Sequence, residues 1–318
     1  MFTVIAGGVG AARFLRGMTA AGLGPDTVAV VNTGDDTQMH GLSISPDIDT
    51  VTYTLASAID PERGWGLAGE TWRAMESLAR FDGVRPQGSA AGATWFNLGD
   101  ADLATHLYRT ARLAEGATLS QVTDEVRRAF GVDVRIVPMS DDRVATSVTL
   151  AEGGTVTFQE YFVKLRHSVA VSAVEFRGAD TARFVDMSLI DGADAVVIAP
   201  SNPVVSIGPV RALAGVDEAL RRRRGSVVAV SPIVAGAALK GPADRMLSEL
   251  GMEPSVVGVA RMYAPVCGTL VIDSRDAHLS GEVEACGLRC VVTDTIMSAP
   301  GVAESLARTV VDAATGRA

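Results

Sequence analysis

The stretch FTVIAGGVGAARFLRGM, residues 2–18, decides the class of fold. It begins with a short apolar run, Phe2 to Ala6, of the kind that forms a buried parallel strand. Glycines then turn the chain, and from Ala11 onward apolar residues recur at i, i+3, i+4 and i+7, the spacing of one face of a helix. A second apolar run, Thr27 to Val31, follows. This order of strand, loop, helix and strand predicts an α/β fold with an open, doubly wound sheet.

The rest of the chain predicts a Rossmann-like core with a mainly parallel sheet, carrying a mixed α/β insertion. The middle of the chain has a capping box at Thr118 and Gln121, and a run from Thr146 to Val163 that alternates around a glycine turn as a β-hairpin does. We therefore predict a nucleotide-binding core from residues 1–60 and 170–318, and an inserted helical and hairpin subdomain over 61–169. Further strands are predicted at 195–199, 227–230, 270–272 and 290–292, and helices at 100–115 and 118–130.

The composition excludes several classes of protein. Of 318 residues, 47% are hydrophobic and 5% aromatic, which is too apolar for a disordered chain and suits a buried parallel sheet. The net charge of −9 argues against a protein that grips the phosphates of a nucleic acid. We find no basic leader, no apolar run long enough to span a bilayer and no paired spacing among the three cysteines. We therefore expect a cytoplasmic protein that binds neither nucleic acid nor membrane.

The glycine turn after the first strand is a candidate phosphate site. Gly7, Gly8 and Gly10 would let backbone N–H groups approach an anion at the start of a helix, with Arg13 close by. The spacing is neither the dinucleotide pattern G-x-G-x-x-G nor a P-loop, because no third glycine and no Gly-Lys-Ser/Thr follow. By itself the turn is equally compatible with a tight joint between a strand and a helix.

Four aspartates form a candidate metal site beside that turn. Asp35 and Asp36 follow the second strand, and Asp47 and Asp49 open the next predicted helix. Mg²⁺ is commonly held by one or two carboxylates together with substrate phosphates, so these residues predict a magnesium site. The alternative is that Asp47 or Asp49 only caps the helix.

Polar clusters also follow almost all of the remaining buried strands. In an open α/β sheet, ligands bind at the edge formed by the carboxyl ends of the strands. Asp100 is a good N-cap for the next predicted helix, whereas Asp102 and His106 lie on its first turns, where polar residues can hold an alcohol or an anion. The recurrence of such clusters predicts one large phosphorylated ligand along this edge. The remaining clusters are 139–142, 199–209 and 231–240.

The order of these motifs along the chain is more specific than any one of them. The relevant stretches are 7–14, 31–36, 44–50, 59–66, 98–106, 138–142, 158–160, 200–209 and 230–233. Together they resemble the 2-phospho-L-lactate transferase (CofD/FbiA) family nearly from end to end. The glycine turn and the segment from Arg63 to Gly66 are closer to its actinobacterial branch, of the phosphoenolpyruvate transferase type.

The resemblance implies a step in the synthesis of coenzyme F-420. The acceptor would be the deazaflavin Fo, whose ribityl chain ends in a primary alcohol. The donor would be a guanosine diphosphate diester of phosphoenolpyruvate or 2-phospholactate, and GMP would leave when the alcohol attacks the distal phosphorus. The family uses Mg²⁺ and is generally oligomeric, so we expect a homodimer. No single residue decides which three-carbon acid is carried.

The resemblance and the motifs together predict a role for each candidate residue. Asp35, Asp47 and Asp49 would be catalytic and, with Asp36, would surround Mg²⁺. The nucleotide diphosphate would be held by Gly7, Gly8, Gly10, Arg13, Ser201, Asn202, Pro203 and Ser206. Fo would be contacted by Asp49, Thr50, Asn97, Gly99, Asp100, Asp102, His106, Ser140 and Asp141, with Trp65 or Trp95 as an aromatic floor. Family members vary at Asn97.

Two other functions stand as alternative hypotheses. A regulator of the same superfamily, such as a gluconeogenesis or cell-shape factor, would bind a nucleotide sugar without turnover, but the aspartates at 47–49 and 100–102 favour a catalytic site. A nicotinamide oxidoreductase is less favoured, because the dinucleotide fingerprint is absent and Asn32, not an acid, ends the second strand.

Overall fold

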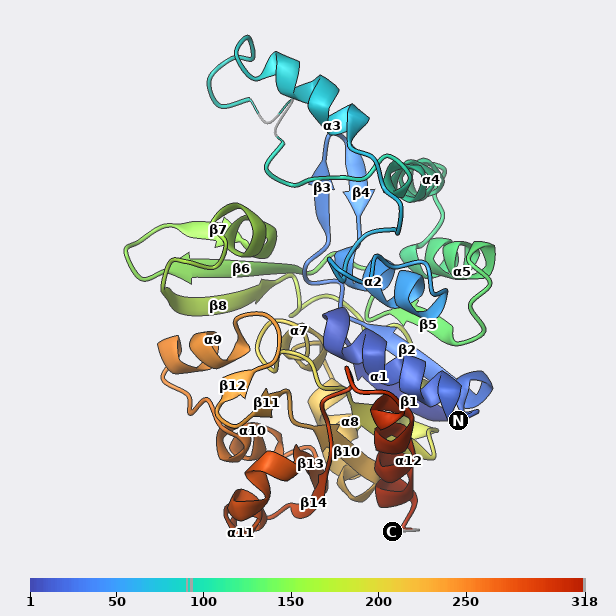
Figure 1. Cartoon of the computed structure of the whole chain (residues 1–318), viewed down its shortest axis with the longest axis vertical. Helices are drawn as coiled ribbons and strands as arrows, with labels where there is room; N and C mark the ends of the chain where they lie inside the picture. The colour runs from blue at the N-terminus through green and yellow to red at the C-terminus, as the bar shows by residue number, and fades with distance from the viewer. Residues whose placement is uncertain (90, 92–93, 317–318) are drawn as a thin grey trace.

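The protein, seen here as a computed structural model that describes residues 1–89, 91 and 94–316, is built around a parallel sheet. Within those residues seven strands form the sheet: β1 (Phe2–Ala6), β2 (Thr27–Val31), β5 (Arg135–Pro138), β9 (Ala195–Ile198), β10 (Val227–Val230), β13 (Thr269–Asp273) and β14 (Arg289–Thr293). Their order is β14-β13-β10-β9-β1-β2-β5, and every pair is parallel (Figure 1). The α/β class, with a doubly wound sheet, is confirmed.

The order of the strands reverses next to β1, and this reversal places the ligand crevice. The chain runs from β1 outward through β2 toward β5, and then returns to the other side of β1 as β9. The chain that leaves β1 therefore leads to a helix on one face of the sheet, and the chain that leaves β9 leads to helices on the other face. In open α/β sheets such a switch point is where ligands bind.

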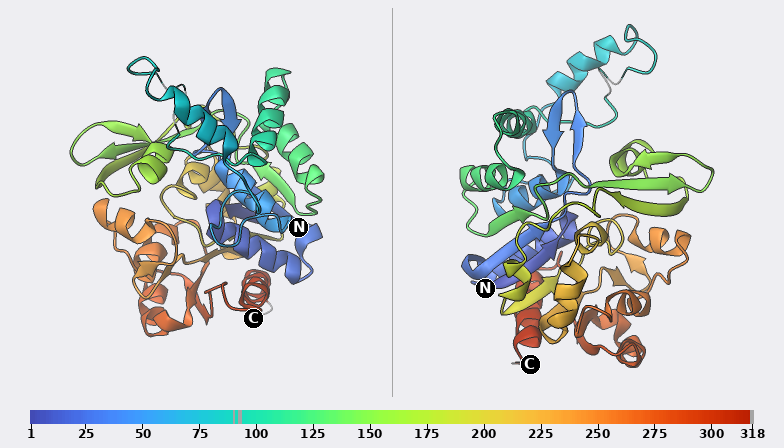
Figure 2. Two further views of the ribbon diagram at one scale, coloured as in Figure 1. Left: turned by 45° about the horizontal axis from the view of Figure 1, so that its top comes forward. Right: turned by 180° about the vertical axis from the view of Figure 1, so that it is seen from behind.

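Helices cover both faces of the sheet, because successive strand residues point to opposite sides. Val4 enters one hydrophobic core and Ile5 the other. The first core packs against α1 (Gly8–Ala20), α2 (Pro46–Leu55) and α12 (Val302–Thr315). The second packs against α8 (Val216–Arg222), α9 (Ala243–Glu249), α10 (Val256–Tyr263) and α11 (Ser280–Ala285), with the short helices α6 (Ser188–Asp191) and α7 (Gly208–Arg211). Figure 2 shows both layers from two further sides.

Most of the remaining elements lie beyond the sheet edge that carries the crevice, whereas α5 (Leu119–Ala129) packs beside β5 (Figure 1). An antiparallel sheet in the order β7-β6-β8 is made of β6 (Ala145–Leu150), β7 (Thr155–Thr157) and β8 (Val171–Arg177). Two small hairpins pair β3 (Thr37–Met39) with β4 (Leu42–Ile44) and β11 (Ile233–Val234) with β12 (Ala237–Ala238). The helices of this region are α3 (Arg73–Leu78) and α4 (Asp102–Ala114), with a π-helical turn over Glu160–Lys164.

The predicted strands and helices agree closely with the structure, but the predicted domain boundaries do not. β5 lies inside the predicted insertion, yet it pairs with β2 in the central sheet. β8 was placed in the core, yet it pairs with β6 in the small sheet. The predicted hairpin ends at Thr157, after which the chain forms the π-helical turn. Strand pairing joins segments that are distant in sequence, so division of the chain into contiguous ranges misassigns both strands.

Two local predictions have different outcomes. The capping box is confirmed, because the Thr118 hydroxyl accepts from Gln121 N and the Gln121 side chain accepts from Thr118 N. The helix predicted from Asp100 begins instead at Asp102. In the described part of the chain, no helix has both the length and the apolar content to cross a bilayer.

We predict that Gly17→Ala destabilises the fold. Gly17 lies on α1 where α12 crosses it, and a Cβ there would collide with the carbonyl oxygen of Ala303. Backbone cannot move aside as a side chain can, so we expect a loss of about 2 kcal/mol in the free energy of unfolding, as for other overpacked cores. The matched control is Gly281→Ala, in helix α11, where a Cβ meets nothing within 4 Å. That change should be neutral or mildly stabilising. Equal effects of the two substitutions on denaturant unfolding would contradict the packing argument.

Candidate active site

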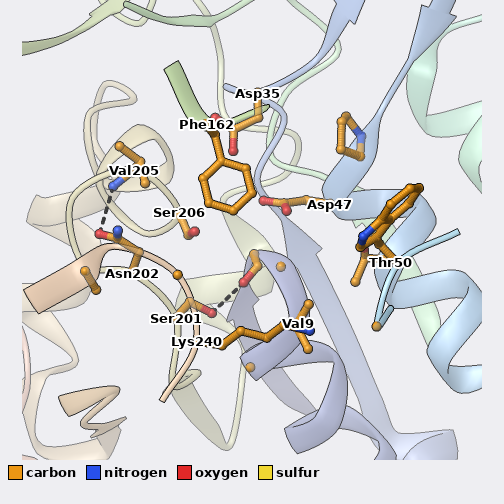
Figure 3. Close-up of a pocket in the computed structure, with 18 of the residues that line it drawn as sticks. Val9, Asp35, Asp47, Thr50, Phe162, Ser201, Asn202, Val205, Ser206 and Lys240 are labelled. Carbon is orange, nitrogen blue, oxygen red and sulfur yellow. Dashed lines mark hydrogen bonds between the residues drawn. The ribbon is translucent and has the colours of Figure 1, made fainter. Parts of the chain in front are cut away.

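A cavity of about 870 Å³ lies at the switch point of the sheet. Its walls come from the loops after β1, β2, β9 and β10 and from the start of α2. Elements outside the central sheet also contribute, among them the π-helical turn at Glu160–Lys164. A volume of this size is within the range that encloses a small-molecule ligand. Figure 3 shows that Asp35, Asp47, Phe162, Ser206 and Lys240 point into it from separate elements.

The glycine turn after β1 forms the floor of the cavity, and it leaves no room for side chains. A Cβ on Gly7 would lie 2.8 Å from Ser206 Cβ and 2.9 Å from Asp47 Oδ2, and one on Gly10 would collide with the carbonyl oxygen of Pro200. Gly8 has φ +68°, the left-handed region that favours glycine. Ser201 Oγ donates to the carbonyl oxygen of Gly7 over 2.7 Å. The loops after β1 and β9 are therefore in close contact, and the backbone at the start of α1 is exposed to a ligand.

Asn32 orients Asp47. The Asn32 side-chain oxygen accepts from Gly34 N at 2.8 Å, which fixes the amide so that Nδ2 donates to Asp47 Oδ2 at 2.9 Å. Burial raises the pKa of Asp47 to about 6. Asp35 is also buried, and its pKa is raised well above the ordinary value by burial and by the neighbouring charges of Asp47 and Asp36. Two buried carboxylates that face one space repel each other, and a cation between them would relieve that repulsion.

Asp35 and Asp47 fit a magnesium ion. Asp35 Oδ1 is buried and has no hydrogen-bond partner, and both residues line the cavity where substrate phosphates would lie. Two carboxylates completed by phosphate oxygens and water are a common Mg²⁺ arrangement. In the described residues, no group of three or more His, Cys, Asp or Glu is placed to hold a metal ion. The donor set would therefore be this pair together with the substrate.

The predicted set of four carboxylates is not brought together as one group. Ser45 Oγ donates to Asp36 Oδ2 at 2.7 Å, and Asp36 does not line the cavity. Burial raises the pKa of Asp36 to about 8. Asp49 lines the cavity, but both of its oxygens face the guanidinium of Arg109.

A buried polar network surrounds Asp49. Arg109 Nη1 donates to Asp49 Oδ2 at 3.1 Å, and Nη2 donates to Oδ1. The same Nη1 lies 3.3 Å from His106 Nδ1, which must be the acceptor because a guanidinium only donates. On the other side of the ring, His106 Nε2 lies 3.4 Å from Asp102 Oδ2, and Tyr53 donates to Asp102 Oδ1 at 2.5 Å. This network joins α2 to α4 and gives the buried Asp49 a counter-charge in Arg109.

Aromatic rings form part of the cavity wall. Phe162 stacks between Phe158 and His167, with ring centroids 5.5 and 5.4 Å apart. Trp65 and Trp95 also line the cavity, as expected. Trp65 is 44% exposed, with the Arg63 guanidinium over its ring at 5.4 Å from the centroid. Such a wall suits a flat conjugated ring system.

Most of the predicted site residues line this cavity. They are Gly7, Gly8, Gly10, Arg13, Asp35, Asp47, Asp49, Thr50, Asn97, Asp102, His106, Ser201, Asn202 and Ser206. Those that do not are Asp36, Gly99, Asp100, Ser140, Asp141 and Pro203.

The residues outside the cavity have structural roles. The Asp100 carboxylate accepts from the backbone N–H groups of Arg73 and Ala74, and so caps α3. Asp141 Oδ1 accepts from Ser120 N in the first turn of α5. Ser140 Oγ donates to the carbonyl oxygen of Arg183 at 2.6 Å. These polar residues satisfy backbone groups of elements that are distant in sequence.

Gly99 and Pro203 also lie elsewhere. A Cβ on Gly99 would collide with the carboxylate of Glu70, which accepts from Ala101 N and Asp102 N and so caps α4. Pro203 lines a separate groove of about 470 Å³ beside β8.

Several residues of the site were missed by the sequence analysis. Asn32 argues in the sequence only against a dinucleotide enzyme, and no motif marks Phe162 as a ligand contact. Lys240 belongs to the predicted polar cluster at 231–240, but the sequence assigns it no role. Arg109 could have been found from the sequence. It lies three residues after His106, so both side chains are on the same helix face, and a charged residue there is placed to interact with the histidine.

The comparisons with known proteins agree with one another. The model of the family described as 2-phospho-L-lactate transferase CofD matches residues 2–308. A phosphoenolpyruvate transferase of Kitasatospora aureofaciens is 44% identical over 314 residues, with 96% of this chain and 95% of that protein covered. One of Streptomyces griseus is 42% identical over 311 residues, with the same coverage. The solved structure of BH3568 from Bacillus halodurans has a TM-score of 0.61 at 13% identity, covers 98% of both chains and is similar in fold.

We predict that Arg109→Met strongly destabilises the protein. Arg109 is 1% exposed, and its removal leaves the Asp49 charge buried without a partner. Breaking a buried ion pair in this way costs about 3–5 kcal/mol in the free energy of unfolding. The matched control on the same helix is Arg112→Met, since Arg112 pairs with Glu115 and Glu125 at the surface. Chemical denaturation should show a large loss for the first variant and little change for the second, and similar losses would rule out the ion pair as the cause.

Proposed function

This chain belongs to the 2-phospho-L-lactate transferase CofD family, and on that premise we propose that it is a transferase of coenzyme F-420 biosynthesis. The donor is the guanosine diphosphate diester of phosphoenolpyruvate, or of 2-phospholactate. The acceptor is the ribityl hydroxyl of the deazaflavin Fo. The products are GMP and the phosphodiester of Fo, which is the dehydro form of coenzyme F-420-0 when phosphoenolpyruvate is carried. Of the two acids we favour phosphoenolpyruvate, because the relatives from Kitasatospora aureofaciens and Streptomyces griseus are phosphoenolpyruvate transferases.

One observation carries this proposal: a single cavity joins the bare glycine turn to the pair of buried carboxylates. The turn offers backbone N–H groups to a diphosphate, while Asp35 and Asp47 face the same space. A phosphoryl-type transfer requires mainly positioning and charge stabilisation, and these two features supply both.

The reaction follows from the placement of these groups. The Fo hydroxyl oxygen forms a bond to the distal phosphorus, and the bond from that phosphorus to the bridging oxygen breaks. The bridging oxygen keeps the electron pair and leaves as part of GMP. The hydroxyl proton passes to a carboxylate oxygen of the Asp35–Asp47 pair that does not hold Mg²⁺. Mg²⁺, when bound by Asp35 and Asp47, would supply positive charge to the phosphate oxygens.

The part of the cavity wall that carries aromatic rings suits the deazaflavin. The rings of Trp65, Trp95 and Phe162 offer apolar surface to a flat ring system. The hydroxyl groups of the ribityl chain would form hydrogen bonds with Asp49, Thr50 and Asn97. Because Arg109 already engages both oxygens of Asp49, we assign Asp49 to binding and orientation and not to proton transfer.

The family resemblance also supports a homodimer that works in the cytoplasm. Sedimentation equilibrium would test the dimer, and fractionation of the native cells would test the compartment. Neither property enters the chemical argument.

The decisive test is to offer purified protein Mg²⁺, Fo and each guanylylated acid separately: phosphoenolpyruvate, 2-phospholactate and 3-phosphoglycerate. We expect GMP release together with a product whose mass identifies the acid. If no acid gives GMP or product, the proposal fails. A thermal shift with UDP-sugars, but none with GDP or Fo, would instead favour the nucleotide-sugar regulator.

We predict that Asp35→Asn lowers kcat by about 100-fold or more while the apo protein stays folded. The substitution removes one of two mutually repelling buried carboxylates, so the melting temperature without Mg²⁺ should stay equal or rise. It should also abolish the increase in melting temperature that Mg²⁺ gives the wild type.

The matched control is Asp36→Asn. Asp36 lies outside the cavity, and burial raises its pKa, which favours the uncharged form that the amide resembles. Activity and the Mg²⁺ shift should be nearly normal. Equal losses in the two variants would refute the assignment of the metal site to Asp35 and Asp47.

A further inference from the structure

Lysine is rare in this protein, and one of the few lysines lies in the cavity. The chain has 26 arginines but only two lysines, Lys164 and Lys240. Lys164 pairs with Glu160 at 3.7 Å. Lys240 follows the β11–β12 hairpin and lines the cavity. Among the described residues Lys240 makes no ion pair, and its Nζ donates only to the carbonyl oxygen of Arg63, at 3.3 Å.

The surroundings of Lys240 are positive. Its pKa is lowered by partial burial and by the charge of Arg13. Arg13 also lines the cavity and has no ion pair among the described residues. Two unpaired cations held close together repel each other, and an anion between them would remove this cost.

The charges lie on different sides of the glycine turn. Figure 3 shows the Lys240 side chain extended toward Val9 at the start of α1. Asp47 lies on the other side, within 3.5 Å of the positions that a Cβ on Gly7 or Gly8 would take. A diphosphate that crosses the turn would therefore have the carboxylate pair near one phosphate and the cations near the other.

The space around the ammonium is kept open by a glycine. A Cβ on Gly64 would collide with Lys240 Nζ, and Gly64 has φ +71°, which disfavours any side chain. A lysine ammonium is a compact point charge on a flexible stem, whereas an arginine presents a larger planar fork. The close approach of the ammonium to Gly64 suits the smaller group.

We propose that Lys240 is a catalytic residue that binds the phosphate of the departing nucleoside monophosphate. This inference rests on the proposed function. As the bond between the distal phosphorus and the bridging oxygen breaks, the electron pair stays on that oxygen, and the phosphate of GMP gains negative charge. The Lys240 ammonium neutralises this charge, with Arg13 beside it. No proton needs to leave Lys240 during the step.

The first experiment measures nucleotide affinity by calorimetry, with GDP as the probe. Charge-assisted hydrogen bonds to phosphate are among the stronger polar contacts, so Lys240→Met should weaken GDP binding by about 10-fold or more. Lys240→Arg should recover part of the affinity but less of kcat, because its fork does not fit beside Gly64. The matched control is Arg308→Met, which removes one positive charge from the exposed face of α12. It should bind GDP as the wild type does.

The second experiment uses the scarcity of lysine. Wild-type protein is acetylated with and without GDP, and the two lysines are compared by peptide mass. GDP should slow acetylation of Lys240 several-fold and leave Lys164 unchanged. Wild-type GDP affinity in Lys240→Met, or equal acetylation of Lys240 with and without GDP, would overturn the proposal.

The two experiments separate this inference from the proposed function. If the wild type transfers a phospho-acid to Fo but GDP does not protect Lys240, the proposed function stands and the role of Lys240 is refuted. If GDP protects Lys240 but no guanylylated acid is consumed, the proposed function and the catalytic role both fail. Protection together with a loss of kcat in Lys240→Met supports the whole inference.

Discussion

The structure depends on the close approach of two loops at the switch point of the sheet. The start of α1 lies against the loop after β9, so close that a side chain on Gly10 would collide with the carbonyl oxygen of Pro200. Ser201 joins the same two loops through its hydrogen bond to Gly7. Without these glycines the helix would have to shift away from the sheet edge, and the cavity would lose its floor. Fold and site therefore share one constraint.

The buried carboxylates of the site divide into two kinds. Asp49 has its counter-charge within the protein, in Arg109, and that ion pair ties α2 to α4. Asp35 and Asp47 have no cation among the described residues, and Asn32 only orients Asp47. Burying charge without a partner is costly, and functional sites are where proteins keep such groups. The net charge of −9 therefore includes aspartates of quite different purpose.

Sequence reasoning succeeded where the signal was local. β1, β2 and β10 have the bounds that their apolar runs predict, and the capping box at Thr118 forms as expected. It failed where a polar residue serves a distant element. Asp100 caps α3 and Asp141 contacts the first turn of α5, although both follow the pattern of ligand-binding loops. An aspartate after a strand has the same sequence signal whether its partner is a substrate or the end of another helix.

Local patterns in the sequence were enough to predict the class of fold, the glycine turn and the order of motifs that identifies the family. These depend on periodicity and spacing, which are properties of neighbouring residues. Only the tertiary structure decided that β5 joins the central sheet, that Asp49 is neutralised by Arg109, and that Lys240 lies across the turn from Asp47. The physical reason is that strand pairing and the energies of buried charges depend on which distant segments meet. That information exists only once the chain has folded.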